Sequence, residues 1–531
     1  MNNGTFYYQN ADTAFAQQHH YDVRSYELEL AVYLDPSLRK GNLQGEMKIK
    51  YVILKDMSEL TLNFSSNMQV DSIRGAEDFR HSRNLLKINI NPELTAGDTS
   101  AIIVYYHGWP QAYHAWIPGW TLETVGFNDK VYPWISTTNP PFGAQSWMPC
   151  KDDPSDKADS LRVRLNVPDS LVAVSNGILS DKKSSSNGRI IYEWSSSYPI
   201  ATYLITVHIG PFLKYEQICR SGGEKPFPVQ LYCFSRDLPQ SSLVFTQLTG
   251  MFNYFNHVLG DYPFENEKYG MVKHAMRGGM ENQTLTGVLD INPRRESLYA
   301  HELAHQWFGN MVTPSSFHDT WISEGLATYF TGLYLQHTRG GTTLKYYMKS
   351  RRYLKKGSVL VQDITDPEQV YHSGRIYYKA AWLFYMLHQK IGDEAFYQAI
   401  HNILEHHAYG NISKEQLFQE FEFVSNIELH RFFEQWVKEK VIPELVWEIR
   451  ENKASQRFYS YNINVKQNQE SRIPFEMPVE LLFKGTEKDS LLRFELNQWK
   501  ENFSVQLPYK VISVQVDPEM KMLLDYEIAQ P

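Results

Sequence analysis

The chain has 531 residues, a formal net charge of −8 at pH 7, and contents of 42% hydrophobic and 14% aromatic residues. This composition is typical of globular domains with sizeable cores and excludes a disordered chain. The negative balance gives no basic surface for a nucleic-acid partner. No apolar run approaches the length of a membrane-spanning helix, and the length suggests about three domains.

The N-terminal stretch MNNGTFYYQNADTAFAQQHH has no basic segment followed by an apolar one, so we expect no signal peptide. The three cysteines, Cys150, Cys219 and Cys233, form no disulfide framework and no C-x-x-C pair. We therefore expect a cytoplasmic protein, or a periplasmic or secreted one if a signal was removed. The sequence does not determine the oligomeric state, and a monomer is our expectation.

The hydrophobic pattern changes twice along the chain. Segments between about residues 21 and 212 alternate apolar and polar side chains, which predicts an all-β domain over residues 1–212. Helical spacing dominates from about 240 to 440 and predicts a mainly helical domain over 213–442. Short alternating segments then return and predict a β-sandwich over 443–531. The chain is therefore expected to be a multi-domain α+β protein.

A motif with possible metal ligands lies in the segment SLYAHELAHQWFGN, which starts at residue 297. Its apolar residues recur at helical spacing, and no Pro or Gly interrupts the run before Gly309. His301 and His305 are four residues apart and would share one face of a helix. They are either two zinc ligands or two polar residues on a helix surface.

Glu324 is the candidate for a third ligand. Eighteen residues separate it from His305, and its segment DTWISEGLATYF predicts a second helix. Two antiparallel helices joined by a short loop could bring its carboxylate beside both imidazoles. Two histidines and a glutamate are a known ligand set of catalytic zinc, which keeps a fourth position open for water. The spacing therefore favours one catalytic zinc ion per chain.

Three motifs together resemble one family. HELAHQWFGN followed by WISEG, the upstream Gly278-Gly279-Met280-Glu281-Asn282, and the downstream Tyr377-Tyr378-Lys379 are similar to segments of the gluzincin aminopeptidases. That family includes aminopeptidase N and leukotriene hydrolase. The resemblance covers nearly the whole chain, and it implies an N-terminal β saddle, a thermolysin-like catalytic domain and a C-terminal β-sandwich.

The chemistry of the motif and the resemblance assign roles to these residues. Glu302 lies beside the metal ligands and can take a proton from a zinc-bound water and later deliver it to the leaving amine. The resemblance implies that the Tyr377 hydroxyl stabilises the oxyanion. It also implies that Gly278, Gly279, Met280, Glu281 and Asn282 form the substrate loop, in which Glu281 pairs with the free α-ammonium of a peptide.

The chain departs from the family pattern in two places. Larger members continue into a C-terminal helical domain, so this short form is expected to have a more open site. The family also places a Gln or Glu in the first domain, where this chain has Thr138 or Asn139. Nearby, Asp152, Asp153 and Asp156 are expected in a solvated loop instead of a cation site.

Three hypotheses about function remain. The first is a zinc aminopeptidase that removes single N-terminal residues from peptides. The second is a zinc hydrolase of the same family with another reaction, either an endopeptidase or an epoxide hydrolase. The third is a non-catalytic relative that binds peptides. The Glu281 loop argues against the endopeptidase, and the intact ligands and base argue against the non-catalytic relative.

Overall fold

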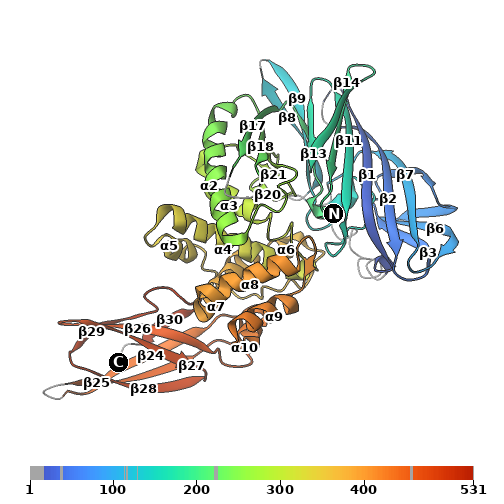
Figure 1. Cartoon of the computed structure of the whole chain (residues 1–531). Helices are drawn as coiled ribbons and strands as arrows, with labels where there is room; N and C mark the ends of the chain where they lie inside the picture. The colour runs from blue at the N-terminus through green and yellow to red at the C-terminus, as the bar shows by residue number, and fades with distance from the viewer. Residues whose placement is uncertain are drawn as a thin grey trace. The chain divides into compact units, whose positions relative to one another are not determined.

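The computed structural model describes residues 17–35, 37, 40–112, 114, 118–127, 129–220, 225–454 and 458–529. By its internal contacts the chain divides into two compact units. Figure 1 labels the helices and strands of the chain. The first unit comprises Met1–Phe317, Asp363–Val370 and Ile403–Ser413, and the second comprises His318–Gln362, Tyr371–Asn402 and Lys414–Pro531.

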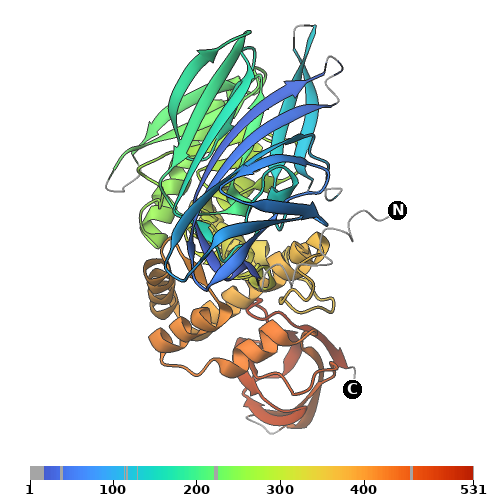
Figure 2. The same cartoon turned by 90° about the vertical axis from the view of Figure 1, so that its right-hand side faces the viewer.

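The largest sheet of the first unit has seven strands in the order β13-β14-β11-β1-β2-β7-β4. Figure 2 shows the long strands of the N-terminal part in blue to green. The alternating segments of the sequence form it, because every second side chain of a strand faces the core. In β1, Leu28 is buried and lies opposite Met47 of β2 and Val163 of β11. The strands are β1 (Tyr21–Leu34), β2 (Gly41–Ile53), β4 (Gln69–Arg74), β7 (Thr99–Gly108), β11 (Ser160–Pro168), β13 (Ile178–Ser185) and β14 (Arg189–Ser196).

Smaller sheets complete the β-rich part of this unit. A four-stranded sheet has the order β12-β16-β9-β8, a three-stranded sheet has the order β3-β6-β5, and β10 pairs with β15. Their strands are β3 (Met57–Asn63), β5 (Asp78–Ser82), β6 (Leu85–Leu94), β8 (Gly119–Phe127), β9 (Lys130–Thr138), β10 (Lys157–Ala158), β12 (Val172–Ser175), β15 (Ile200–Ala201) and β16 (Val207–Gly210).

A further five-stranded sheet carries the candidate substrate loop. Its order is β17-β18-β19-β21-β20, so β20 is an edge strand. The strands are β17 (Leu213–Cys219), β18 (Phe227–Cys233), β19 (Tyr269–Lys273), β20 (Gly279–Met280) and β21 (Leu285–Val288). The other elements of the unit are α2 (Ser241–Leu259), α3 (Glu296–Ala304), α6 (Pro367–Val370) and the paired strands β22 (Thr313–Pro314) and β23 (Asn411–Ile412).

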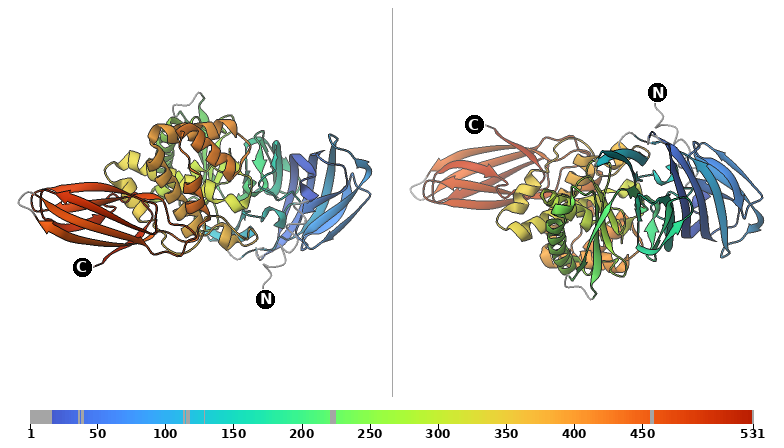
Figure 3. Two further views of the ribbon diagram at one scale, coloured as in Figure 1. Left: turned by 90° about the horizontal axis from the view of Figure 1, so that it is seen from below. Right: turned by 90° about the horizontal axis from the view of Figure 1, so that it is seen from above.

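The second unit begins with helices and ends with strands. Its helices are α4 (Trp321–Arg339), α5 (Thr343–Lys349), α7 (Ala380–Ile391), most of α8 (Asp393–His406), α9 (Lys414–Ser425) and α10 (His430–Phe433). The strands are β24 (Glu444–Ala454), β25 (Tyr459–Gln467), β26 (Met477–Gly485), β27 (Asp489–Leu496), β28 (Lys500–Leu507), β29 (Val511–Val516) and β30 (Asp525–Ala529). They form sheets of order β28-β25-β24-β30 and β27-β26-β29, which lie at one end of the unit (Figure 3).

The sequence also raised expectations about membrane-spanning helices and about the cysteines. Among the described residues, no helix is both long and apolar enough to cross a membrane. Cys150, Cys219 and Cys233 are all buried, and none of them is in a disulfide.

Candidate functional site

The two histidines of the motif lie at the end of α3. His301 is in the last turn of this helix, which ends at Ala304, and His305 is the next residue. The sequence allowed the helix to continue as far as Gly309, but it stops five residues earlier. It stops because the backbone N–H groups of residues 306 and 307 bond carbonyl groups three residues back and close a tight turn. The turn leaves both imidazoles on one side of the chain.

The geometry of the two imidazoles fits a shared metal ion. His305 Nδ1 lies 2.9 Å from the carbonyl oxygen of Phe308 and donates to it, so in this tautomer Nε2 carries the lone pair that can bind a metal. That Nε2 atom lies 3.2 Å from Nε2 of His301. Two nitrogen ligands of a tetrahedral zinc ion lie about 3.3 Å apart, given Zn–N bonds of about 2.05 Å.

A carboxylate completes a possible donor set. Glu324 lies in the first turn of α4 and is 3% exposed. One ligand atom from each of His301, His305 and Glu324 can be chosen so that all three atoms lie within 4.8 Å of one another. Two neutral nitrogens and one carboxylate oxygen are donors that zinc accepts. The residues present therefore fit the metal that the sequence predicted.

Glu302 lies directly against the candidate substrate loop. Its side chain is buried, and a β-carbon added to Gly279 would overlap its carboxyl group. Any other residue at this position would therefore displace either the loop or the carboxylate. The contact places the predicted base beside the backbone of an edge strand.

The turn after α3 also holds the candidate substrate loop in place. Asn310 Nδ2 donates to the carbonyl oxygen of Glu281 at 2.7 Å, and Gln306 Nε2 donates to the same oxygen at 3.3 Å. Gln306 Oε1 accepts from the backbone N–H of Thr284 at 3.0 Å. Both amides are completely buried. Sequence reasoning missed these two residues, and their only signal was an amide side chain on either side of the apolar Trp307 and Phe308.

The five loop residues differ in exposure. Gly278 is exposed and has φ = +91°, a backbone conformation that favours glycine. Gly279 is half-buried, whereas Met280 and Glu281 are buried at 3% and 9% exposure. Asn282 is also buried, and its side-chain amide has no hydrogen-bond partner among the described residues.

A buried lysine supports the turn from the β-rich part of the same unit. Lys157 Nζ donates to the carbonyl oxygens of Asn310 and Met311 at 2.8 and 3.0 Å. Burial lowers the pKa of Lys157 to about 7. The three-residue link from Lys157 through Asn310 to Glu281 thus connects β10, the turn and the candidate substrate loop.

Tyr377 lies in a π-helical segment, Ser373–Lys379, that leads into α7. Its side chain is half-buried. Lys379 of the same segment is buried, and its Nζ donates to the carbonyl oxygens of Gly357 and Glu439, each at 2.9 Å. Single turns of π-helix inside α-helices are frequent at functional sites.

The first-domain position of the family pattern holds no carboxylate here. Thr138 and Asn139 are both buried. Thr138 Oγ1 lies 2.9 Å from Nε2 of His274, and Asn139 Oδ1 accepts from Trp147 Nε1 at 3.0 Å. Both side chains are therefore engaged inside the protein.

The acidic segment that follows does not lie in a solvated loop, so that expectation was wrong. Asp152, Asp153 and Asp156 are 1%, 6% and 5% exposed. Asp156 pairs with the buried Lys151 at 2.5 Å, and Asp152 accepts from Thr202 Oγ1 at 2.9 Å. The internal partners compensate for the loss of hydration, which the sequence pattern could not reveal.

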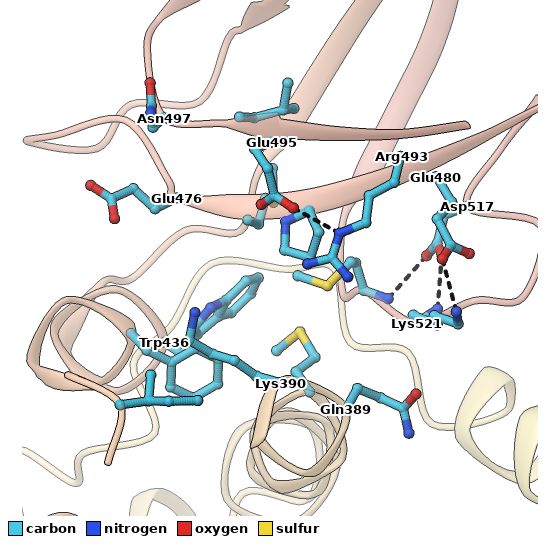
Figure 4. A pocket seen from close by; sticks show the side chains of 17 residues that line it. Gln389, Lys390, Trp436, Glu476, Glu480, Arg493, Glu495, Asn497, Asp517 and Lys521 are labelled. Carbon is cyan, nitrogen blue, oxygen red and sulfur yellow. Dashed lines mark hydrogen bonds and ion pairs between the residues drawn. The ribbon is translucent and has the colours of Figure 1, made fainter. Parts of the chain in front are cut away.

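Two cavities lie at different places in the fold. One of about 340 Å³ is in the first unit, beside Gly278 of the candidate substrate loop. The other, of about 350 Å³, lies within the second unit between the side chains of α7 and α10 and those of β26 and β27. Figure 4 shows its lining, in which Trp436 lies on the helical side and Arg493 is paired with Glu495 on the strand side. None of the predicted site residues lines this second cavity.

The sequence matches two family models. Residues 17–204 match the peptidase M1 N-terminal domain, and residues 245–436 match the peptidase family M1 domain. Together these two segments cover more than half of the chain.

Several known proteins are similar to the chain. Glutamyl aminopeptidase of Homo sapiens is 22% identical over 90% of this chain and 53% of its own length. Leucyl aminopeptidase of Saccharolobus solfataricus is 26% identical over 78% of this chain and 53% of its own. The chain thus spans about half the length of these relatives.

Solved structures share the fold. A mutant M1 zinc metallopeptidase from Deinococcus radiodurans is 23% identical, with a TM-score of 0.70 over 80% of this chain and 96% of that one. A second structure of that protein is described as bound to the substrate Tyr-Ser-Ala, with a TM-score of 0.69 and 22% identity over the same shares of the two chains.

Proposed function

Because the chain belongs to peptidase family M1, we propose that it is a zinc-dependent aminopeptidase that hydrolyses the N-terminal peptide bond of peptides. The observation that carries the proposal is the grouping of His301, His305 and Glu324 within ligand distance of one another. The contact of Glu302 with Gly279 supports it further, because the predicted base lies beside the predicted substrate loop.

In this proposal His301, His305 and Glu324 hold one zinc ion per chain. When bound, the ion supplies Lewis acidity and lowers the pKa of a coordinated water towards 7. The Phe308 carbonyl orients His305 by accepting from Nδ1. Such a bond to the second nitrogen fixes both the tautomer and the ring orientation of a metal-binding histidine.

Glu302 is the general base and later the general acid. Its carboxylate takes a proton from the attacking water and delivers it to the amide nitrogen that leaves. Because Glu302 is buried against the Gly279 backbone, its carboxylate has little freedom to move away from the scissile bond. Tyr377, assigned by its similarity to the family motif, donates its hydroxyl to the oxygen on which negative charge develops.

The loop Gly278–Asn282 binds the substrate, and Glu281 pairs with the α-ammonium of its first residue. The edge position of β20 supports this role, since an extended peptide can add to an exposed strand edge. Thr138 and Asn139 bring no charge to the amine, as both are bonded internally. Glu281 is therefore the acid on which recognition of the free N-terminus depends.

The proposal includes the arrangement of the chain into three domains. These are a β saddle over residues 1–212, a thermolysin-like catalytic domain over 213–442 and a β-sandwich over 443–531. The seven-stranded sheet supports the first, and the two sheets of strands β24 to β30 support the last. We expect the protein to act as a monomer on peptides with a free N-terminus.

The test uses aminoacyl-aminomethylcoumarin substrates with and without N-terminal acetylation. The wild type should cleave the free-amine substrates and leave the acetylated ones nearly intact. Glu281→Ala should lower kcat/KM for free amines by roughly 30-fold or more, because one partner of a partly desolvated charge pair is lost. Glu281→Gln keeps the shape of the side chain and should lose nearly as much.

Equal cleavage of acetylated and free substrates would contradict the aminopeptidase and favour an endopeptidase. Absence of cleavage in every arm, with zinc bound, would favour the non-catalytic relative. The two kinds of substrate differ only in whether their N-terminal amine is free, so each outcome favours a different hypothesis.

A further inference from the structure

The direction of a bound peptide follows from the proposed function. Its ammonium lies at Glu281, and its scissile bond lies near Glu302, which contacts Gly279. Glu281 is two residues after Gly279 in the chain, so the peptide runs antiparallel to the loop. The residues that follow the scissile bond must then pass Gly278 and approach Arg277.

A cavity lies at this end of the loop. Its volume is about 340 Å³, and it is lined by Arg277, Gly278, Leu289, Asp290, Arg295 and Leu298. Leu298 is three residues before His301 on α3, so both side chains lie on the same side of that helix. The cavity therefore borders the path of the substrate on the side away from Glu281.

Positive charge predominates among the residues of this cavity. Among the described residues that line it, Asp290 is the only acid, and its carboxylate already faces Arg295 Nη2 at 3.3 Å and Lys273 Nζ at 3.8 Å. Arg277 is exposed, and within the described ranges its guanidinium has no hydrogen bond or ion pair. A guanidinium without a partner can bind a carboxylate with two parallel hydrogen bonds.

We propose that Arg277, assisted by Arg295, binds a carboxylate of the substrate two or three residues after its N-terminus, so that the enzyme prefers short or acidic peptides. The length of the loop agrees with this distance. Arg277 lies four residues before Glu281, at most about 13 Å along an extended strand. The ammonium and the terminal carboxylate of an extended tripeptide lie about 10 Å apart. This inference rests on the proposed function.

The carboxylate could be the C-terminus of a short peptide or an acidic side chain, and three substrates separate these sources. They are Ala-Ala-Ala with a free C-terminus, Ala-Ala-Ala amide, and Ala-Ala-Asp amide, each assayed for released alanine. We expect kcat/KM of the wild type to be about tenfold higher for at least one carboxylate-bearing peptide than for the neutral amide, since about tenfold corresponds to one good charged contact. The gain should appear mainly as a lower KM, because the contact is remote from the reacting atoms.

The variants identify the residue responsible. Arg277→Ala should abolish the preference and leave kcat/KM for the neutral amide unchanged. Arg277→Lys should restore part of it, since an ammonium keeps the charge but not the planar two-point contact. Arg294→Ala is the matched control, because Arg294 is exposed nearby but does not line the cavity. It should keep the full preference.

The outcomes distinguish this inference from the proposed function. Equal kcat/KM for all three wild-type substrates would overturn the inference, and so would a preference that survives Arg277→Ala. Release of alanine from the neutral amide in those cases would leave the aminopeptidase intact. If no alanine is released from any peptide, the proposed function itself fails.

Discussion

At the scale of single residues, Glu302 and Gly279 depend on each other. The glycine leaves space that the carboxylate occupies, and a β-carbon there would overlap it. The motif H-E-x-x-H predicted the glutamate, but it did not explain the second glycine of the loop. The explanation is a packing contact between α3 and the edge strand β20, two elements well separated in the sequence.

We predict that Glu302→Gln keeps the fold and the metal but lowers kcat by roughly two or more orders of magnitude, the range expected for a general base. The amide has nearly the shape of the carboxylate, so the packing against Gly279 should persist. The measurement is kcat together with the metal content of the same preparation. Glu296→Gln, in the first turn of the same helix, is a control with near-normal kcat. Turnover near that of the wild type would remove Glu302 from the mechanism.

The sequence predicted residues whose chemistry is recognisable by spacing, such as His301 and His305. It did not predict Gln306 and Asn310, because their partner, the Glu281 carbonyl, lies 25 and 29 residues away in the chain. The burial of Asp156 was missed for a different reason. Its pairing with Lys151 occurs inside the protein, whereas clustered acids in a sequence suggest a solvated loop.

At the scale of elements, regular periodicity predicted strands well and helix ends poorly. The alternation of Tyr26 to Leu34 corresponds to β1, and the returning alternation after residue 443 corresponds to β24 to β29. The early end of α3 was not predictable, because a hydrogen-bonded turn and not Pro or Gly ends it. The π-helical turn at Ser373–Lys379 likewise has no periodicity of its own.

One histidine joins two of these elements in the first unit. His274 follows β19, and its Nε2 atom lies 3.1 Å from the carbonyl oxygen of Thr137 at the end of β9. Its Nδ1 atom accepts the backbone N–H of Met276 at 2.8 Å. The ring is therefore neutral, and burial lowers the pKa of His274 to about 4.

This pKa predicts how the contribution of His274 to stability changes with pH. A group whose pKa is lower in the folded than in the unfolded state stabilises the fold above its unfolded pKa of about 6.5. That contribution is lost as the pH falls from about 6.5 towards 4. We therefore expect the difference in Tm between the wild type and His274→Gln to shrink between pH 7 and pH 5.

The difference in Tm between the two proteins separates the effect of His274 from that of other groups that titrate in the same pH range. The pKa of Asp152 is raised to about 7 by burial, so its contribution changes in the opposite direction. The pKa of the neighbouring His208 is also lowered by burial. Asp152 is present in both proteins and cancels in the difference. The pKa of His208 is also lowered by the charge of His274, so any change at His208 is part of the effect of His274. A Tm difference that stays constant or grows at lower pH would show that His274 is not kept neutral by the fold.

At the scale of the whole molecule, the sequence predicted the order of β-rich and helical parts, which the observed order of strands and helices confirms. The predicted domains are contiguous segments of the chain, whereas each of the two observed units is made of three separate segments. Residues 403–413 belong to the first unit although they follow helices of the second, because β23 pairs with β22. Pairing between distant segments leaves no local mark in composition, so the domain boundaries after residues 212 and 442 stay a prediction.

Removal of the metal should affect the whole molecule. We predict one zinc ion per chain in protein purified without chelators, and a lower Tm after treatment with a chelator. A ligand that binds only the folded protein stabilises it by RT ln(1 + [L]/Kd), which is about 4 kcal/mol at a thousandfold excess over Kd. Elemental analysis and thermal melting of the same samples measure both quantities.

Glu324→Ala tests whether the carboxylate belongs to the donor set. Two imidazoles alone should hold zinc weakly, because a catalytic site takes three protein ligands. The variant should therefore contain little zinc, and its Tm should no longer respond to the chelator. Glu302→Gln changes a neighbouring carboxylate that is not a ligand and should keep both the metal and the chelator response. Less than about half a zinc per chain in the wild type, or full zinc content in Glu324→Ala, would contradict the three-ligand site.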